Sequence, residues 1–157
     1  MTREEFAEQI LAMQQTMYRV SCGILRREVD REDAVQECIC KAWVKRDTLK
    51  EPGAFRAWVL RILVNECYDI GRRSARTVLT DEIPERIAPS DEEPRNVREA
   101  ILQLEDLYRL PITLFYIEGF TIREIADILK VPEGTVKSRL HTGRTKLKGF
   151  LSEEVHA

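Results

Sequence analysis

A stretch of acidic residues and prolines near the middle of the chain limits the folds that this sequence can adopt. Residues 81–94 hold six acidic residues, one basic residue and three prolines. Proline removes a backbone donor and like charges repel, so this stretch has little capacity to form a helix or a buried core. The 157 residues are therefore divided into two short halves, each of which must build its own core. We expect residues 79–95 to be a flexible acidic linker.

Three stretches before the linker show the apolar spacing of amphipathic helices. The first predicts one long helix, whose apolar stripe is Phe6, Ile10, Met13, Met17, Val20 and Ile24. A second helix is predicted over about 31–47, with Asp30 as its N-cap and Asp33 as a weak capping-box partner. After a turn, a third stripe predicts a helix that begins near Phe55 and ends near Gly71.

The third predicted helix also has a polar, cationic face. Arg61, Asn65 and Arg72 are spaced to project from one side, opposite the apolar stripe. A solvated surface is one interpretation of this pattern. The other is a track for DNA, since guanidinium groups hold phosphates and a carboxamide can read a base edge. Trp58 lies on the apolar stripe, so we expect it to pack in the core rather than stack on DNA.

After the linker, the pattern predicts a helix-turn-helix. Two helices are expected first, over about 97–108 and 110–118. Thr121 and Glu124 form a capping box at the start of a short helix. A three-residue turn then leads to a final helix over about 133–150. A basic second helix in such a motif can enter the major groove of DNA.

The charge of the final helix supports this interpretation. The net charge is −2, yet residues 130–148 hold six basic residues and one acid. Such segregation lets a near-neutral chain present a local cationic surface. Side chains near the N-terminal end of the helix lie closest to base edges, whereas Arg144, Lys146 and Lys148 are placed to meet phosphates. A basic surface helix of a plain bundle is the alternative.

Several functional classes find no support in the sequence. The four cysteines have no spacing that suits a disulfide framework or a zinc site, and Cys38 and Cys40 diverge by about 200° on a helix. With two histidines and no glycine-rich phosphate loop, we expect no enzyme, no cofactor and no metal site. No apolar run reaches about 18 residues, so we expect a cytoplasmic chain without membrane insertion.

Three motifs stand in order along the chain. The first is Asp33 to Glu37 followed by Lys41-Ala42-Trp43; the second is Phe55 to Asn65 followed by Asp69 and Arg72-Arg73; the third comprises Leu110-Pro111 and residues 118–121, 124–126 and 134–140. Together they resemble the extracytoplasmic-function (group 4) sigma factors of the sigma-70 family of bacterial RNA polymerase. The first two resemble region 2, and the third resembles region 4.

This resemblance implies an all-α fold of two small helical domains. Residues 1–78 would form the region 2 bundle, 79–95 the linker and 96–157 the region 4 helix-turn-helix. The implied function is to bind core RNA polymerase and direct promoter-specific initiation, with melting at the −10 element and recognition of the −35 element. A stand-alone helix-turn-helix regulator would bind an operator without polymerase, and a protein-interaction adaptor would ignore DNA; both remain alternatives.

The resemblance also implies site residues on three surfaces. The residues implied in binding core polymerase, at the clamp helices of its largest subunit, are Asp33, Gln36, Glu37 and Lys41. Those implied at the −10 element are Asp47, Lys50, Arg56, Arg61, Asn65, Arg72 and Arg73, with the turn over 47–53 capturing a base flipped from the non-template strand. Those implied at the −35 element are Glu133, Thr135, Lys137, Ser138, Arg139, His141 and Arg144. The polymerase β flap, promoter DNA and an anti-sigma factor complete the expected partners.

The chain departs from the family pattern at two places with physical consequences. Lys130 stands where glycine is usual in the turn, and a left-handed backbone there costs a non-glycine residue about 1 kcal/mol. Thr142-Gly143 replaces Arg-Ala in the final helix, which removes a cation and weakens the helix by about 1 kcal/mol.

Overall fold

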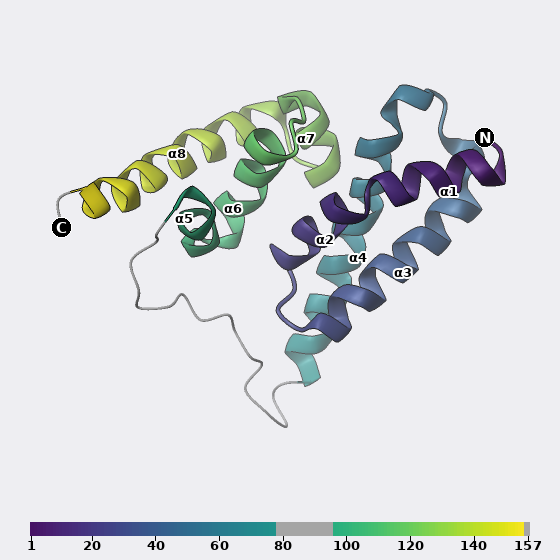
Figure 1. Cartoon of the computed structure of the whole chain (residues 1–157), viewed down its shortest axis with the longest axis horizontal. Helices are drawn as coiled ribbons and strands as arrows, with labels where there is room; N and C mark the ends of the chain where they lie inside the picture. Colours follow the sequence, from purple (N-terminus) through teal and green to yellow (C-terminus); the bar gives the residue numbers. More distant parts are fainter. Residues whose placement is uncertain (78–95, 156–157) are drawn as a thin grey trace. The chain divides into compact units, whose positions relative to one another are not determined.

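The computed structural model describes residues 1–77 and 96–155, and every regular element in these ranges is helical (Figure 1). The predicted all-α class is therefore confirmed for the described residues. The chain divides into two compact units, Met1–Glu85 and Arg86–Ala157. The linker expected at 79–95 lies outside the described residues. Within the described ranges, no helix combines the length and the apolar character that a bilayer span requires.

The first unit is built on a long pair of helices. Helices α3 (Glu28–Lys45) and α4 (Phe55–Thr77) pack along each other, and α2 (Gln14–Cys22) packs on both. Helix α1 (Arg3–Ala12) precedes α2, and two short 3₁₀ turns, η1 (Arg46–Thr48) and η2 (Pro52–Ala54), connect α3 to α4. The core holds the almost fully buried side chains of Met17, Val20, Cys38, Val59, Leu60 and Leu63.

Several helices of the first unit begin or end at other residues than the sequence predicts, although α4 begins at Phe55 as expected. The single long first helix is wrong, because Met13 (φ −99°, ψ 1°) separates α1 from α2. Its side chain is 2% exposed, so the apolar stripe continues across the break. Asp30 is not an N-cap, because α3 begins at Glu28, three residues before the predicted start, and its N-cap is Arg27. Asp30 accepts a hydrogen bond of 3.2 Å from Ser74 on α4. Gly71 does not end α4, which continues for six further residues, to Thr77.

The second unit packs its shorter helices on one long helix. These are α5 (Val97–Gln103), α6 (Asp106–Ile112), the π-helical turn η3 (Thr113–Ile117) and α7 (Ile122–Leu129). Helix α8 (Glu133–Val155) packs on α5, α6 and α7. The side chains buried most deeply in this unit include Leu104, Ile112, Leu114, Ile125, Ile128 and Val136.

The helix start predicted at Leu110-Pro111 is wrong, because Pro111 lies inside a helix that begins at Asp106. Proline cannot donate to the helical ladder, and the backbone widens into the π-helical turn η3 directly after it. Gly119 ends this segment as predicted. Its φ of +77° lets the Phe120 N–H donate to the Leu114 carbonyl over 2.9 Å, a bond that glycine-terminated helices commonly make.

The predicted helix-turn-helix is confirmed in its local chemistry. The Glu124 N–H donates to the Thr121 hydroxyl over 3.1 Å, and the Thr121 N–H donates to the Glu124 carboxylate over 3.0 Å. Lys130 ends α7 in the left-handed conformation, with φ 56° and ψ 47°. Helix α8 then begins at Glu133, as expected, and extends past the predicted end at 150.

Close packing against Ile112 explains why position 143 is a glycine, and the sequence alone does not reveal this contact. A Cβ added at this position would lie 2.8 Å from Cγ1 and 3.1 Å from Cδ1 of Ile112. Helix α8 therefore approaches α6 more closely than any larger residue at position 143 permits.

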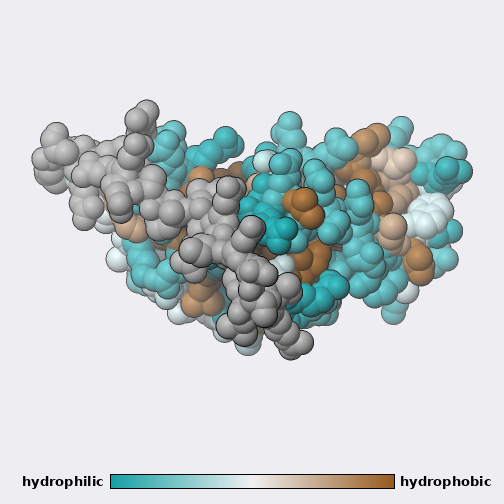
Figure 2. Space-filling model, turned by 90° about the horizontal axis from the view of Figure 1, so that it is seen from below, coloured by the Kyte–Doolittle hydropathy of each residue, from teal (hydrophilic) through white to brown (hydrophobic). Residues whose placement is uncertain are grey.

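The face drawn in Figure 2 is largely hydrophilic and broken by separate hydrophobic patches.

Candidate functional site

Helix α3 presents a polar face to solvent. Asp33, Gln36 and Glu37 are all exposed, and their spacing of three and four residues places them on one side of the helix. Cys40 and Val44 continue the same face, and Val44 is 76% exposed. Sequence reasoning did not select Val44, although its spacing from Gln36 and Cys40 carries that information.

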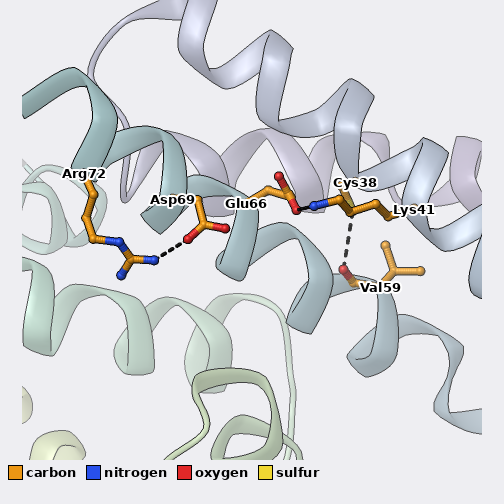
Figure 3. A network of polar contacts seen from close by, with 6 residues as sticks. All are labelled: Cys38, Lys41, Val59, Glu66, Asp69 and Arg72. Atoms are coloured by element: carbon orange, nitrogen blue, oxygen red, sulfur yellow. Dashed lines mark hydrogen bonds and ion pairs between the residues drawn. The ribbon is translucent and has the colours of Figure 1, made fainter. Parts of the chain in front are cut away.

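The fourth residue expected on this surface, Lys41, is engaged within the unit. Its ammonium group pairs with the carboxylate of Glu66 on α4, and Figure 3 shows the two side chains pointing toward each other. The hydrogen bond to Glu66 raises the pKa of Lys41 above its ordinary value. Glu66 is only 3% exposed, because its spacing from Val59 and Leu63 places it on the buried face of α4. Sequence reasoning missed Glu66, although this spacing was available.

A polar hollow opens at the surface between α3 and α4. It is lined by Glu37, Lys41, Glu66, Asp69, Arg72 and Arg73. Arg72 forms an ion pair with Asp69 one turn earlier on α4 (Figure 3). The hollow thus brings together residues that the sequence assigned to two different surfaces, the polymerase surface and the −10 surface.

The cationic face of α4 carries some of the residues that the sequence implied at the −10 element. Arg61, Asn65 and Arg72 are exposed and share one side of the helix, as predicted. Arg56 and Arg73 are exposed too, but helical geometry turns them about 140° and 120° away from Arg61. One face of α4 therefore combines two guanidinium groups with one carboxamide.

The segment that joins α3 to α4 carries exposed charged residues and precedes two packed aromatic rings of α4. Asp47 and Lys50 are exposed in this segment. The Phe55 ring lies 6.1 Å from that of Trp58, and Trp58 is half-buried, which agrees with a packing role. The segment therefore presents two charged side chains to solvent and leads into a packed pair of aromatic rings.

On α8, the expected residues divide between two flanks. Glu133, Lys137, Ser138, His141 and Arg144 are exposed, whereas Thr135 and Arg139 are half-buried on the opposite flank. Arg144 donates a hydrogen bond of 3.1 Å to the Tyr116 hydroxyl, which holds the guanidinium group at the helix surface. Lys146, which the sequence predicts to meet phosphates, bonds to Glu105 over 3.0 Å and lies 5.1 Å from the centroid of the Tyr108 ring.

The cysteines are unpaired thiols in distinct environments. Cys40 is exposed, Cys22 is half-buried, and Cys38 and Cys67 are buried. The Cys38 thiol donates a hydrogen bond of 3.5 Å to the Val59 carbonyl oxygen (Figure 3). Burial raises the pKa of Cys38 and of Cys67 to about 12. Over the described residues, no group of three metal-ligating side chains comes together.

Two family models match the chain, one on each unit. The model described as Sigma-70 region 2 matches residues 10–77, and the model described as Sigma-70, region 4 matches residues 95–147. The ECF RNA polymerase sigma factor SigW of Bacillus subtilis is 28% identical over 96% of this chain and 91% of its own length. The ECF RNA polymerase sigma factor SigL of Mycobacterium tuberculosis is 31% identical over 87% of this chain and 83% of its own. The sigma factor RpoE of Bartonella quintana, solved in complex with the anti-sigma factor NepR, matches with a TM-score of 0.78 and 26% identity over 95% of this chain and 98% of its own.

Proposed function

The chain belongs to the extracytoplasmic-function sigma factors of RNA polymerase, and from this premise we propose how its residues bind core polymerase and direct promoter-specific initiation of transcription. The observation that carries the proposal is the order of the two matched regions, each on its own unit, one with a cationic helix face and one with a helix-turn-helix. A stand-alone regulator would not require region 2. Sigma factors as a class are not enzymes, and we infer that this one acts without catalysis in the cytoplasm.

We infer that α3 docks on the clamp helices of the largest polymerase subunit. The support is the single exposed face that carries Asp33, Gln36 and Glu37. Carboxylates and a carboxamide on such a face suit basic and polar partners. Lys41 borders this surface, but its pairing with Glu66 gives it a second, structural task.

The −10 element is assigned to α4 and to the segment before it. Arg61 and Arg72 would hold phosphates of the separated strand, and Asn65 would bond to a base edge. Asp47 and Lys50 would line the site that receives a base taken out of the stack. Extrusion of a base costs a few kcal/mol, and contacts in a matching pocket offset this cost.

The −35 element is assigned to α8. Its exposed N-terminal residues Glu133, Lys137 and Ser138 would meet base edges in the major groove. Arg144, held by Tyr116, would meet a phosphate on the adjacent backbone. Two weak DNA-binding surfaces on one chain raise the effective concentration of each for the other, so the pair selects promoters that carry both elements.

We also infer that an anti-sigma factor binds this chain. The support is the similarity to RpoE, which was solved with its anti-sigma factor NepR. Such a partner would compete for surfaces that the chain needs in order to join polymerase.

The proposal is tested by run-off transcription with the full chain, bacterial core RNA polymerase and a library of promoter fragments. We expect transcripts only when the chain is present, and about tenfold fewer with Gln36→Ala plus Glu37→Ala, as for the loss of two interface contacts. Glu8→Ala plus Gln15→Ala is the matched control, since these exposed residues of α1 and α2 are the same residue types on another surface. Tight binding of the chain alone to duplex DNA, without association with core polymerase, would overturn the proposal in favour of a stand-alone regulator. If the chain supports no transcription and binds no duplex DNA, the result would favour a protein-interaction adaptor.

A further inference from the structure

The segment between α3 and α4 begins with an arginine that is stacked on a tryptophan. The guanidinium carbon of Arg46 lies 3.7 Å from the centroid of the Trp43 ring, well within the range of a cation–π contact. The same guanidinium group donates a hydrogen bond of 2.7 Å to the Trp43 carbonyl oxygen. The backbone N–H of Arg46 also donates to that oxygen. Arg46 is therefore fixed to Trp43 by its side chain and by its backbone.

Trp43 in turn belongs to a cluster of aromatic rings. Its ring meets that of Phe6 on α1 edge-on, with centroids 5.2 Å apart and an interplanar angle of 65°. Phe6 meets Phe55, the first residue of α4, at 5.9 Å and 89°. Phe55 is 2% exposed and cannot move without disturbing the core. Both ends of the segment over 46–54 are thus anchored to the same cluster.

The segment between these anchors is held by few local bonds. The Thr48 hydroxyl donates to the Lys45 carbonyl over 2.7 Å, and the Leu49 N–H donates to the Arg46 carbonyl over 3.3 Å. The acceptor of the second of these bonds is the backbone carbonyl of Arg46. The orientation of the exposed residues Asp47 and Lys50 therefore depends on where Arg46 sits.

We propose that Arg46, seated on Trp43, is a positioning residue that fixes the η1 turn so that Asp47 and Lys50 can receive a base displaced from the promoter duplex. This inference rests on the proposed function, because it assumes that the segment captures such a base. A turn that is already in its binding conformation loses less conformational freedom when the base arrives. It also holds the contacts that distinguish one base from another at a constant distance.

A direct contact between Arg46 and a phosphate is the competing role, and it has a different signature. Loss of a phosphate contact weakens binding to all sequences alike, and a lysine restores most of it. Loss of a positioning contact changes the preference among bases. A lysine restores only part of that preference, because its ammonium group lacks the planar shape that stacks on an indole ring.

The test measures promoter opening by the full chain with core polymerase. The promoters carry each of the four bases in turn at each position of the −10 element, and 2-aminopurine fluorescence beside the element reports opening. For Arg46→Gln, we expect the ratio between the best and the worst base to fall about tenfold at one or more positions. Arg46→Lys should fall between Arg46→Gln and the wild type. Lys45→Gln, which removes a charge from the exposed neighbouring residue, should keep the wild-type ratio.

Circular dichroism is used to find a temperature at which the wild type and the three variants are all folded. The affinity of each variant for core polymerase should differ from that of the wild type by less than about twofold, since Arg46 lies outside the α3 face. The wild-type base ratio in both Arg46 variants overturns the inference, and so does an equal loss on all sequences that Arg46→Lys restores. Both of these outcomes leave the sigma-factor assignment intact. If the wild type itself opens no promoter with core polymerase, the proposed function fails, and this inference fails with it.

Discussion

The ammonium group of Lys41 bonds to the carboxylate of Glu66 across the seam between α3 and α4, which joins a side chain that is 40% exposed to one that is 4% exposed. The hollow beside this pair holds further charges of both signs. A carboxylate this deeply buried depends on its cation, because removal of one partner leaves the other without compensation. The pair therefore links the surface that we propose binds polymerase to the stability of the first unit.

We predict that Lys41→Met destabilises the first unit by about 2 kcal/mol at neutral pH, a value reduced for the exposure of the lysine. Urea unfolding followed by tryptophan fluorescence measures this unit alone, since Trp43 and Trp58 are the chain's two tryptophans. The double variant Lys41→Met plus Glu66→Met should recover much of the loss, and wild-type stability of Lys41→Met would contradict the prediction.

The close approach at Gly143 gives a second prediction. In a free helix, Gly143→Ala would stabilise by about 1 kcal/mol, but the new methyl group would meet Ile112 Cγ1 at 2.8 Å, and overpacking costs about 1–3 kcal/mol. We expect a net loss of stability in the second unit. Far-ultraviolet circular dichroism follows the unfolding of both units, whereas tryptophan fluorescence follows only the first. The unfolding of the second unit is therefore the part of the dichroism change that fluorescence does not show.

Gly149→Ala is the matched control, because nothing lies within 4 Å of a Cβ added there. It should be neutral or stabilising. In a double-mutant cycle, Gly143→Ala should cost less in an Ile112→Ala background than in the wild type. Equal effects of the two glycine substitutions would show that the contact with Ile112 does not matter.

The left-handed backbone of Lys130 predicts a stabilising substitution. Lys130→Gly should stabilise the second unit by about 1 kcal/mol, because glycine adopts φ 56° without steric cost. Lys130→Ala removes the same charge but keeps the strain, so it should not stabilise. The same dichroism transition measures both variants, and a similar gain in each would identify charge as the cause.

The buried thiols predict a pattern of chemical reactivity. At pH 8, iodoacetamide should modify Cys40 first and Cys22 more slowly, as peptide mapping by mass spectrometry would show. A pKa of about 12 leaves Cys38 and Cys67 with about a thousandfold less thiolate than an ordinary value of 9.0 gives. Rapid modification of Cys38 in the folded chain would contradict this account.

The same pKa values set a stability limit at alkaline pH. The folded state holds the Cys38 and Cys67 protons more tightly than the unfolded state, so stability is fully present below pH 9 and falls as pH rises from 9 toward 12. The raised pKa of Lys41 acts in the same direction at pH values above its ordinary pKa of 10.5, where the lysine begins to deprotonate and its pair with Glu66 is lost. Urea unfolding of the first unit at pH 8, 9 and 10 measures this decline.

Sequence reasoning succeeded where local chemistry decides the structure. The Thr121–Glu124 capping box, the glycine end at Gly119 and the strained turn at Lys130 each depend on residues close together in the chain. The exposed face of Arg61, Asn65 and Arg72 follows from helical spacing alone. The roles assigned to these residues in DNA binding stay predictions.

The sequence-based predictions were wrong where contacts between distant parts of the fold determine the local structure. Asp30 has the chemistry of an N-cap, but Ser74 on α4 takes up its carboxylate inside α3. Pro111 favours a helix start, yet it lies inside α6, and the next turn of the chain, η3, is a wider π-helical turn. Gly143 was interpreted as a weak helix residue, because the sequence contains no information on the distance to Ile112. The outcomes at Asp30 and Gly143 each depend on a residue that lies far away along the chain.

Each of the two units buries its own set of apolar side chains, and the main helix–helix contacts lie within a unit. The promoter-recognition roles proposed for the two units are therefore separable from each other. A chimera that joins residues 1–95 of this chain to the second half of a relative should keep one promoter element of its own and adopt the other from the donor. Evolution can change one half of the promoter code at a time, without refolding the protein that reads it.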